Sequence, residues 1–455
     1  NFLKKEKEKY GLFMDKDGIL KKKGGRSILT EFENNFVVYS TIEKLNHFRK
    51  KGRFKDFSHI DLSGAVLSDG IFVNCNFKNA NFKGANLYWT KFNEADLEGA
   101  NLEKADLECA DLIGANLQKA NLRKANLQEA NLQNADLQNA DLIGANLIGA
   151  ISGKIVGKPK AMPKNYTIFK GYIIGPKVNL KKIKLTEAIL KEVNLQEANL
   201  EGASLHFCEL KGANLEKANL EKADLYETVL SGANLQKAKL YNVIAEAAHL
   251  DNANLSGAIL LKAYLEGADL NNAYLKESDL QGANLQNAYL KGADLQGANL
   301  QNAYLKGADL AFVSSGKIRG VPREMPKYYT IRNGYIIGPA VNLKGANLEG
   351  ADLRFAELRS ANLRGANLKG ADLRAADLYN TELQGANLRG AFLFKNDLLT
   401  GPRGANFEGA IIEGSQYDTS LQPDDPTDDN SSSATVVEVY DEGDVGALSG
   451  AGGIL

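Results

Sequence analysis

Residues 281–310 read QGANLQNAYLKGADLQGANLQNAYLKGADL, a stretch of fifteen residues followed by an identical copy. Within this stretch an alanine stands two residues before each leucine, and the leucines recur at every fifth position: Leu285, Leu290, Leu295, Leu300, Leu305 and Leu310. A period of five matches neither the 3.6 residues of a helical turn nor the alternation of an ordinary strand. The pattern therefore predicts a repeat architecture, in which each unit stacks on its neighbours.

The same pattern continues over most of the chain, with repeat centres from Phe57 to Leu147, from Leu180 to Leu310 and from Leu343 to Leu398. With its A-(D/N)-L-x-x unit, the sequence resembles the pentapeptide-repeat family. The resemblance implies an all-β repeat fold, a right-handed quadrilateral β-helix with four repeats per coil. It also implies that the central residue and the small residue two before it point inward. The expected structural core then includes Leu285, Leu290, Leu295, Leu300, Ala283 and Ala288.

Elementary geometry is consistent with that fold. A five-residue unit that turns a corner places one leucine and one alanine inside each side of a square, and four such sides close a coil. Successive coils then stack at about 4.8 Å, the usual spacing between paired strands. Each unit alone buries too little apolar surface to be stable, so stacking is obligatory.

Two segments, 151–178 and 314–341, interrupt the repeats and are near copies of each other. Both contain G-K-I-x-G, then P-x-x-M-P, then Y-T-I-x-x-G-Y-I-I-G-P. The Asn-Gly pair between two apolar runs in the second copy predicts a β-hairpin, and Lys-Gly is the weaker equivalent in the first. The segments resemble hairpin insertions in long pentapeptide-repeat proteins of cyanobacteria and bacteriophages. We expect the candidate interaction residues of these hairpins to be Lys170, Tyr172, Arg332, Asn333 and Tyr335.

The ends of the chain do not follow the repeat. Residues 1–56 carry 15 Lys and Arg against 8 Asp and Glu, and they include a capping box that predicts a short helix from about 41 to 51. The segment 418–455 carries nine acids and no Lys or Arg. The expected organisation is as follows: 1–56 basic N-terminal cap, 57–150 repeat block 1, 151–178 hairpin insert 1, 179–313 block 2, 314–341 hairpin insert 2, 342–417 block 3 and 418–455 acidic flexible tail.

Charge limits the classes of partner. The formal net charge of −1 argues against general affinity for nucleic acid. The opposite charges of the two ends suggest head-to-tail association of copies, and a tail that folds back on its own chain is the alternative. Both inserts are basic and carry aromatic residues, which suits an anionic partner, whereas lysines that only keep a loop solvated are the simpler explanation. No apolar run is long enough to span a membrane.

We find no motif that indicates chemistry. The four histidines (His47, His59, His206 and His249) are scattered, and no Ser/His/Asp set, metal-ligand spacing or phosphate loop is recognised. The Asn and Asp residues before each centre are interpreted as turn-forming rather than as ligands. We therefore expect a protein that is not an enzyme, with no catalytic, cofactor or metal site.

The sequence favours a structural or interaction scaffold, a rigid β-helical rod that displays hairpins and end segments to a protein partner or to a second copy. A DNA mimic that binds a topoisomerase, as the quinolone-resistance branch of the family does, is the alternative. A mimic needs a continuous acidic face, and the outward positions that follow the centres form no acidic stripe. The setting stays open between a cytoplasmic scaffold and a component of a virus particle or extracellular filament.

Overall fold

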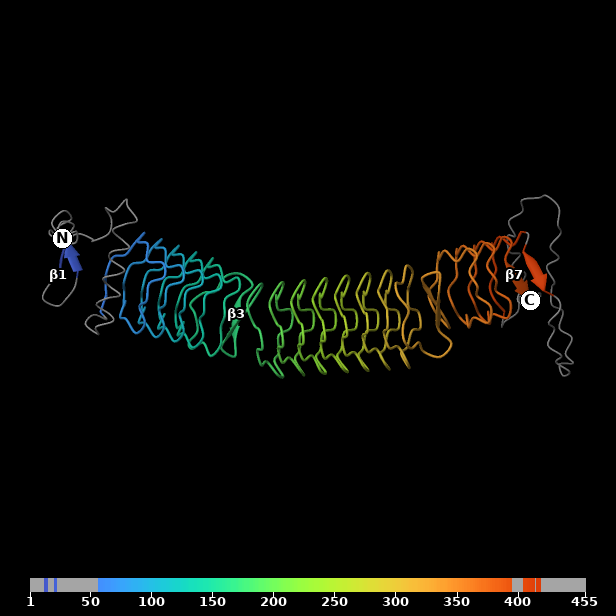
Figure 1. Ribbon diagram of the computed structural model, residues 1–455, viewed down its shortest axis with the longest axis horizontal. Coiled ribbons are helices and arrows are strands. Elements are labelled where there is room, and N and C mark those ends of the chain that lie inside the picture. The colour runs from blue at the N-terminus through green and yellow to red at the C-terminus, as the bar shows by residue number, and fades with distance from the viewer. Residues whose placement is uncertain (1–11, 15–19, 23–55, 395–403, 414, 419–455) are drawn as a thin grey trace, which may run out of the picture. The chain divides into compact units, whose positions relative to one another are not determined.

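The computed structural model describes residues 12–14, 20–22, 56–394, 404–413 and 415–418 (Figure 1). The chain divides into two compact units. The first unit comprises Asn1–Ile183 and Val193–Glu201, and the second comprises Lys184–Glu192 and Gly202–Leu455. Both units are built from the same kind of coil.

Backbone pairing in each unit joins residues at a regular sequence separation of 20. In the first unit Asn81 pairs in parallel with Asn101 and Asn101 with Asn121, and in the second unit Ser204 pairs with Asp224 in the same way. This separation, divided into sides of five, gives four sides to each coil. Along each side the amide of the central residue donates to a carbonyl of the next coil, as from Leu102 to Asn121 at 2.8 Å.

Each side ends in a turn whose second residue has a left-handed backbone. Glycine adopts this conformation freely, as at Gly114 (φ 66°), but Lys104 and Glu129 adopt it too, at φ 58° and 55°. The turn is held by a bond from the next alanine amide to the central carbonyl, for example from Ala105 to Leu102 at 3.0 Å. Because these hydrogen bonds fix the turn, residues other than glycine are tolerated at a position that is costly for them.

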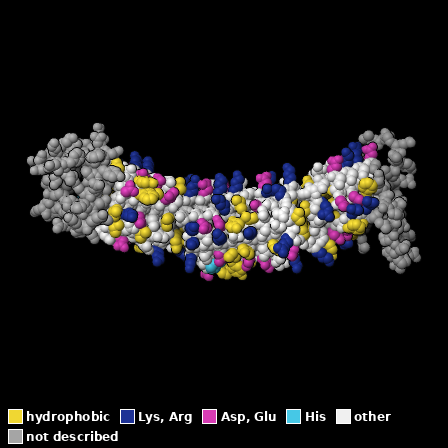
Figure 2. All heavy atoms as spheres, viewed as in Figure 1, with side chains coloured by type: hydrophobic (Ala, Val, Ile, Leu, Met, Phe, Trp, Pro, Cys, Tyr) yellow, Lys and Arg dark blue, Asp and Glu magenta, His cyan; other side chains and the backbone are white. Residues whose placement is uncertain are grey.

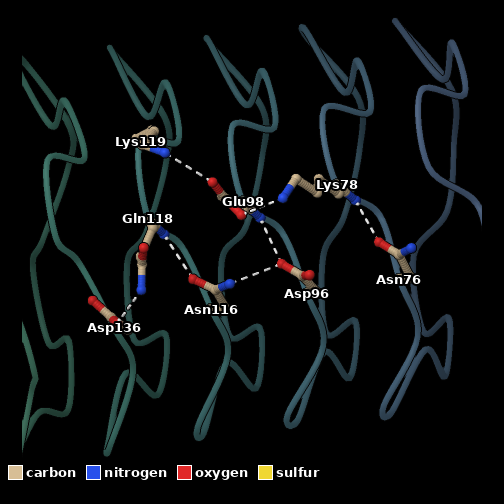
Figure 3. A network of polar contacts seen from close by, with 8 residues as sticks. All are labelled: Asn76, Lys78, Asp96, Glu98, Asn116, Gln118, Lys119 and Asp136. Atoms are coloured by element: carbon tan, nitrogen blue, oxygen red, sulfur yellow. Dashed lines mark hydrogen bonds and ion pairs between the residues drawn. The ribbon is translucent and has the colours of Figure 1, made fainter.

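The Asn or Asp before each centre has two roles in the first unit (Figure 3). Its side-chain oxygen accepts the backbone amide two residues later, as Asn116 does from Gln118 at 3.1 Å. The Asn116 side-chain amide also donates to the Asp96 carboxylate one coil away, at 2.9 Å. These residues are therefore turn-forming and ladder-forming, in agreement with their interpretation from sequence.

The core of each unit lies inside the coils. In the second unit Leu285, Leu290, Leu295 and Leu300 are at most 1% exposed, and Ala283 and Ala288 are fully buried. In the first unit five phenylalanines stand at the centres in place of leucine and contact one another, with ring centroids 5.2 Å apart for Phe77 and Phe82. Burying each such side chain contributes about 1.5–3 kcal/mol, so the interior is the main source of stability.

Besides the single-residue bridges of the ladder, the described residues include eight short strands. β1 (Leu12–Met14) pairs with β2 (Leu20–Lys22), β3 (Thr167–Phe169) with β4 (Tyr172–Ile174), and β5 (Thr330–Arg332) with β6 (Tyr335–Ile337), each pair antiparallel. β7 (Phe392–Phe394) pairs in parallel with β8 (Gln416–Asp418). The expected helix at 41–51 lies outside the described residues, and so does the acidic segment after Asp418.

Candidate interaction modules

The two inserts, named here the first module (151–178) and the second module (314–341), are enlarged coils. Ile151 pairs with Asn179 and Ser314 with Asn342, a sequence separation of 28 where the regular coils have 20. In the first module Val156 and Ala161 also pair with the preceding coil. The backbone ladder therefore continues through each module, and only its last part departs to form a hairpin.

Both hairpins lie against their own coil. The second strands are buried, with Ile173, Ile174, Ile336 and Ile337 fully inaccessible. The Ile173 amide donates to Ser152 Oγ at 2.9 Å, and the Ile336 amide donates to Ser315 Oγ at 3.0 Å. The hairpins are therefore part of the packed structure of their modules, and only one face of each is open to solvent.

The five predicted interaction residues fall into two groups. Lys170, Arg332 and Asn333 are exposed at the hairpin turns. Tyr172 and Tyr335 are half-buried, because each ring covers a glycine of its own module. A Cβ at Gly153 would lie 3.1 Å from the Tyr172 ring, and one at Gly316 would lie 3.0 Å from the Tyr335 ring. The structure thus gives the two tyrosines a packing role and leaves the three polar residues at the surface.

A second tyrosine in each module closes the hairpin, and the sequence analysis did not identify it. Tyr329 Oη donates to the Pro339 carbonyl at 3.1 Å, and Tyr166 Oη donates to the Pro176 carbonyl at 2.9 Å. Burial raises the pKa of Tyr329 to about 12 and also raises the pKa of Tyr166. The signal available in the sequence was the recurrence of this tyrosine at the same distance before a Gly-Pro pair in both copies.

Exposed cations occupy equivalent positions in the two modules: Lys154 and Lys317, Lys160 and Arg323, Lys164 and Lys327. None of the six forms an ion pair with an acidic side chain in the described part of the chain. Arg323 instead stacks 5.2 Å above the Tyr304 ring and donates to its hydroxyl at 2.7 Å. Lys327 Nζ lies 4.5 Å from the Tyr328 ring centroid. The modules therefore present positive charge together with aromatic surface.

Several cations of the regular coils form ion pairs with acidic side chains. Lys78 pairs with Glu98 at 2.6 Å in the first unit, and Arg364 pairs with Glu382 at 3.2 Å in the second. The Lys78 ammonium donates a hydrogen bond to Glu98 and lowers the pKa of that carboxyl group. On the face shown in Figure 2, side chains of both signs are interspersed. This arrangement gives the regular coils no extended surface of one sign on that face.

An open cleft of about 390 Å³ lies beside β6 in the second module. Its lining includes Gln296, Ser314, Tyr335, Asn342 and Lys344. No carboxylate or imidazole of the described residues lines this cleft, so it holds no pair of groups for general acid–base catalysis. Its hydrogen-bonding groups suit recognition of a polar surface.

One constellation contradicts the sequence analysis, which found no Ser/His/Asp set. In the second unit Thr186 Oγ1 lies 3.1 Å from His206 Nε2, while Asp224 Oδ2 and Ser204 Oγ lie 3.2 and 3.0 Å from His206 Nδ1. The regular coil brings these groups together by stacking them in columns. The side chains of His206 and Asp224 remain 32% and 37% exposed, so the cluster lacks the desolvated setting that acyl-transfer triads need.

Metal-binding and membrane-spanning features are also absent from the part of the chain that the structure describes. Its residues include no group of three or more His, Cys, Asp and Glu side chains placed to hold a metal ion. The same residues include no helix with the length and apolar character to cross a membrane.

Family comparison identifies the architecture. The family model for pentapeptide repeats matches residues 60–151, 179–244, 248–311 and 340–393, which is more than half of the chain. The protein therefore belongs to the pentapeptide-repeat family, and its fold is the right-handed quadrilateral β-helix predicted from the sequence. Members of this family are in general non-enzymatic structural or interaction proteins. The comparison with curated proteins returned no match.

Several solved structures are similar. HetL, a pentapeptide repeat protein involved in heterocyst differentiation regulation from the cyanobacterium Nostoc, is 28% identical, with 60% of this chain and 95% of HetL covered and a TM-score of 0.17. A pentapeptide repeat protein from the Arabidopsis thaliana thylakoid lumen is 39% identical over 22% of this chain and 66% of its own, with a TM-score of 0.16. QnrB1, a plasmid-mediated fluoroquinolone resistance protein, is 13% identical over 53% and 87%, with a TM-score of 0.16. With TM-scores this low, the family assignment rests on the repeat model.

Proposed function

We propose that the protein is a non-catalytic scaffold whose stacked coils hold two basic modules and the end segments for contact with a protein partner or a second copy. The observation that carries this proposal is the duplication of one elaborate module within an otherwise uniform repeat. Both copies keep the same hairpin, the same half-buried tyrosine and an exposed cation at the same three positions. A solenoid needs neither insert in order to fold, because its regular coils close without one.

The chemistry of the modules supports contact with another macromolecule. Cations that form no ion pair among the described residues, aromatic rings and an exposed hairpin turn are typical of interaction surfaces that recognise negative charge. Head-to-tail association of copies is the assembly that the charge difference between the ends favours, and it produces rings or filaments.

The test replaces the second module with a regular coil. Residues 314–341 are exchanged for a copy of residues 294–313, which restores the regular sequence separation of 20 and keeps the ladder in phase. Sedimentation velocity of the full chain over a concentration series, at about 0.05 and 0.5 M NaCl, compares the variant with the natural sequence. We expect concentration-dependent association that weakens with salt and weakens further in the variant. Identical sedimentation of the two proteins under every condition would show that the second module takes no part in self-association.

A further inference from the structure

We infer that each module binds anions and that its ligand is the acidic segment 418–455, supplied by the same chain or by a second copy. This inference rests on the proposed function and names the partner of the modules. It follows from comparing the two copies, because shared residues that the fold does not require need another explanation.

Most of the residues shared by the two modules have a structural reason. Ser152 and Ser315 accept the amide of the second hairpin strand. Gly175 and Gly338 leave room for the half-buried tyrosine, because a Cβ at either position would lie 2.2 Å from that ring. Substitution of any of these residues would disturb packing, so the fold alone accounts for their presence in both copies.

The three shared cation positions have no packing role that recurs in both copies, since Arg323 contacts Tyr304 where the first module has Asp141 at the equivalent place. Lys154, Lys160 and Lys164 are exposed in the first module, as are Lys317, Arg323 and Lys327 in the second. Position 160 carries lysine where position 323 carries arginine, so the charge is kept although the side chain differs. Neighbouring exposed positions change character completely: Val156 corresponds to Arg319 and Asn165 to Tyr328. What the two copies have in common at these three places is positive charge.

The composition of the modules leaves these cations with few acids nearby in the sequence. On regular coils, side chains at sequence separations of 18 to 21 meet across neighbouring coils, and several cations pair with an acid there, as Lys181 does with Glu201 at 2.9 Å. Each module keeps a separation of 20 toward the preceding coil and pairs at 28 with the following coil. The second module carries five Lys and Arg against one acid, Glu324. An excess of one sign creates a local potential that attracts a segment of opposite charge.

The chain itself supplies such a segment. Residues 418–455 contain nine Asp and Glu and no Lys or Arg, and four of the acids cluster in 424–429. An extended chain of this length spans up to about 125 Å. Being covalently attached, the segment is present at a high effective concentration, and it would compete with any other anion for the same cations. Nucleic acid is disfavoured because this segment would repel it.

The test is carbodiimide cross-linking of the full chain, which joins a carboxylate to a lysine amine only when the two are in contact. No Lys or Arg follows Arg403, so trypsin releases the acidic segment as one peptide, and mass spectrometry identifies the lysines joined to it. An equal mixture of ¹⁴N- and ¹⁵N-labelled protein separates links within a chain from links between copies. Lys182 and Lys262, exposed on regular coils, are the matched control lysines.

We expect links to Lys154, Lys160, Lys164, Lys317 and Lys327 to exceed those to the control lysines at least about tenfold and to disappear at about 0.5 M NaCl. Arg323→Gln, which removes a charge that carbodiimide cannot link, is expected to reduce the links to Lys317 and Lys327 about threefold. The control Arg364→Gln, outside the modules, leaves them unchanged. A monomer that links only within its own chain would support this inference and would exclude self-assembly.

Links spread evenly over exposed lysines would overturn the inference, as would links that Arg323→Gln does not change. Binding of a labelled single-stranded oligonucleotide, accompanied by the absence of module links, would likewise overturn it in favour of a nucleic acid partner.

Discussion

Gly338→Ala tests how tightly the second module is built. A Cβ at Gly338 would lie 2.2 Å from Tyr329 Cδ1 and 2.6 Å from its Cε1, whereas ordinary carbon contacts are about 3.5–4.0 Å. The ring must move by more than about 1 Å, and this movement breaks the 3.1 Å bond from Tyr329 Oη to the Pro339 carbonyl. Overpacking costs about 1–3 kcal/mol and the lost hydrogen bond about 0.5–1.5 kcal/mol, so we expect a loss of about 2–4 kcal/mol.

Denaturant unfolding measures the total loss, and hydrogen exchange of the amides in β5 and β6 locates it. Gly345→Ala is the control, because its left-handed φ of 66° strains alanine while the space around it is empty. We expect that control to cost only about 1–2 kcal/mol. In the double variant Gly338→Ala/Tyr329→Ala, the added methyl group no longer meets a ring. The two substitutions should therefore be strongly non-additive. An unchanged free energy of unfolding in Gly338→Ala, or full additivity with Tyr329→Ala, would refute the tight packing of Tyr329 against Gly338.

Three further predictions concern the core, the hairpin anchor and pH. Leu295→Ala removes a side chain that is 1% exposed, and it should lower the free energy of unfolding in guanidinium by about 2–5 kcal/mol. The control Leu261→Ala, on the outside of a coil, should lower it by less than about 1 kcal/mol. Equal effects would contradict an inward leucine column. Ser315→Ala leaves the buried Ile336 amide without its acceptor, so it should cost about 1–3 kcal/mol and speed amide hydrogen exchange in β6. Ser152→Ala should have the same effect in the first module. Unchanged exchange would argue against these serines as anchors of the hairpins. The pKa of Tyr329 is about 12 in the folded protein and about 10 in the unfolded protein, so the unfolded state releases the proton first. Stability therefore falls as pH rises from about 10 to 12. Tyr329→Phe should flatten that fall, and an unchanged alkaline stability profile would count against the raised pKa of Tyr329.

The period of five was enough to predict stacked repeats. The resemblance to the pentapeptide-repeat family implied the four-sided coil with Leu285 and Ala283 inside, and the structure buries both. The repeat position of the Asn and Asp residues also predicted correctly that they form turns. A side-chain oxygen at that position reaches the amide two residues later.

The modules were harder to predict from sequence, for a physical reason. Backbone pairing does not depend on the repeat motif, so Val156 and Ala161 keep the ladder although the A-x-L pattern has stopped. Likewise, the fit of Tyr172 over Gly153 joins residues that are distant in the sequence, and no local pattern shows that contact.

The His206 cluster was missed because the histidines were compared with one another and not with the residues one coil away. Once four repeats per coil are assumed, Thr186 and His206 fall in one column, and Ser204 and Asp224 fall in the column beside it. Arranging the outward positions in columns, with one complete coil to a row, would have predicted this contact from the sequence.

The modules, rather than the regular coils, are proposed to make the contacts of this protein. Hydrogen–deuterium exchange of the full chain at about 0.05 and 0.5 M NaCl tests this claim directly, because salt weakens contacts between exposed charges. We expect faster exchange at high salt in peptides from 151–178, 314–341 and 418–455, with residues 204–313 unchanged. Salt-dependent exchange confined to the regular coils, or none anywhere, would contradict the claim.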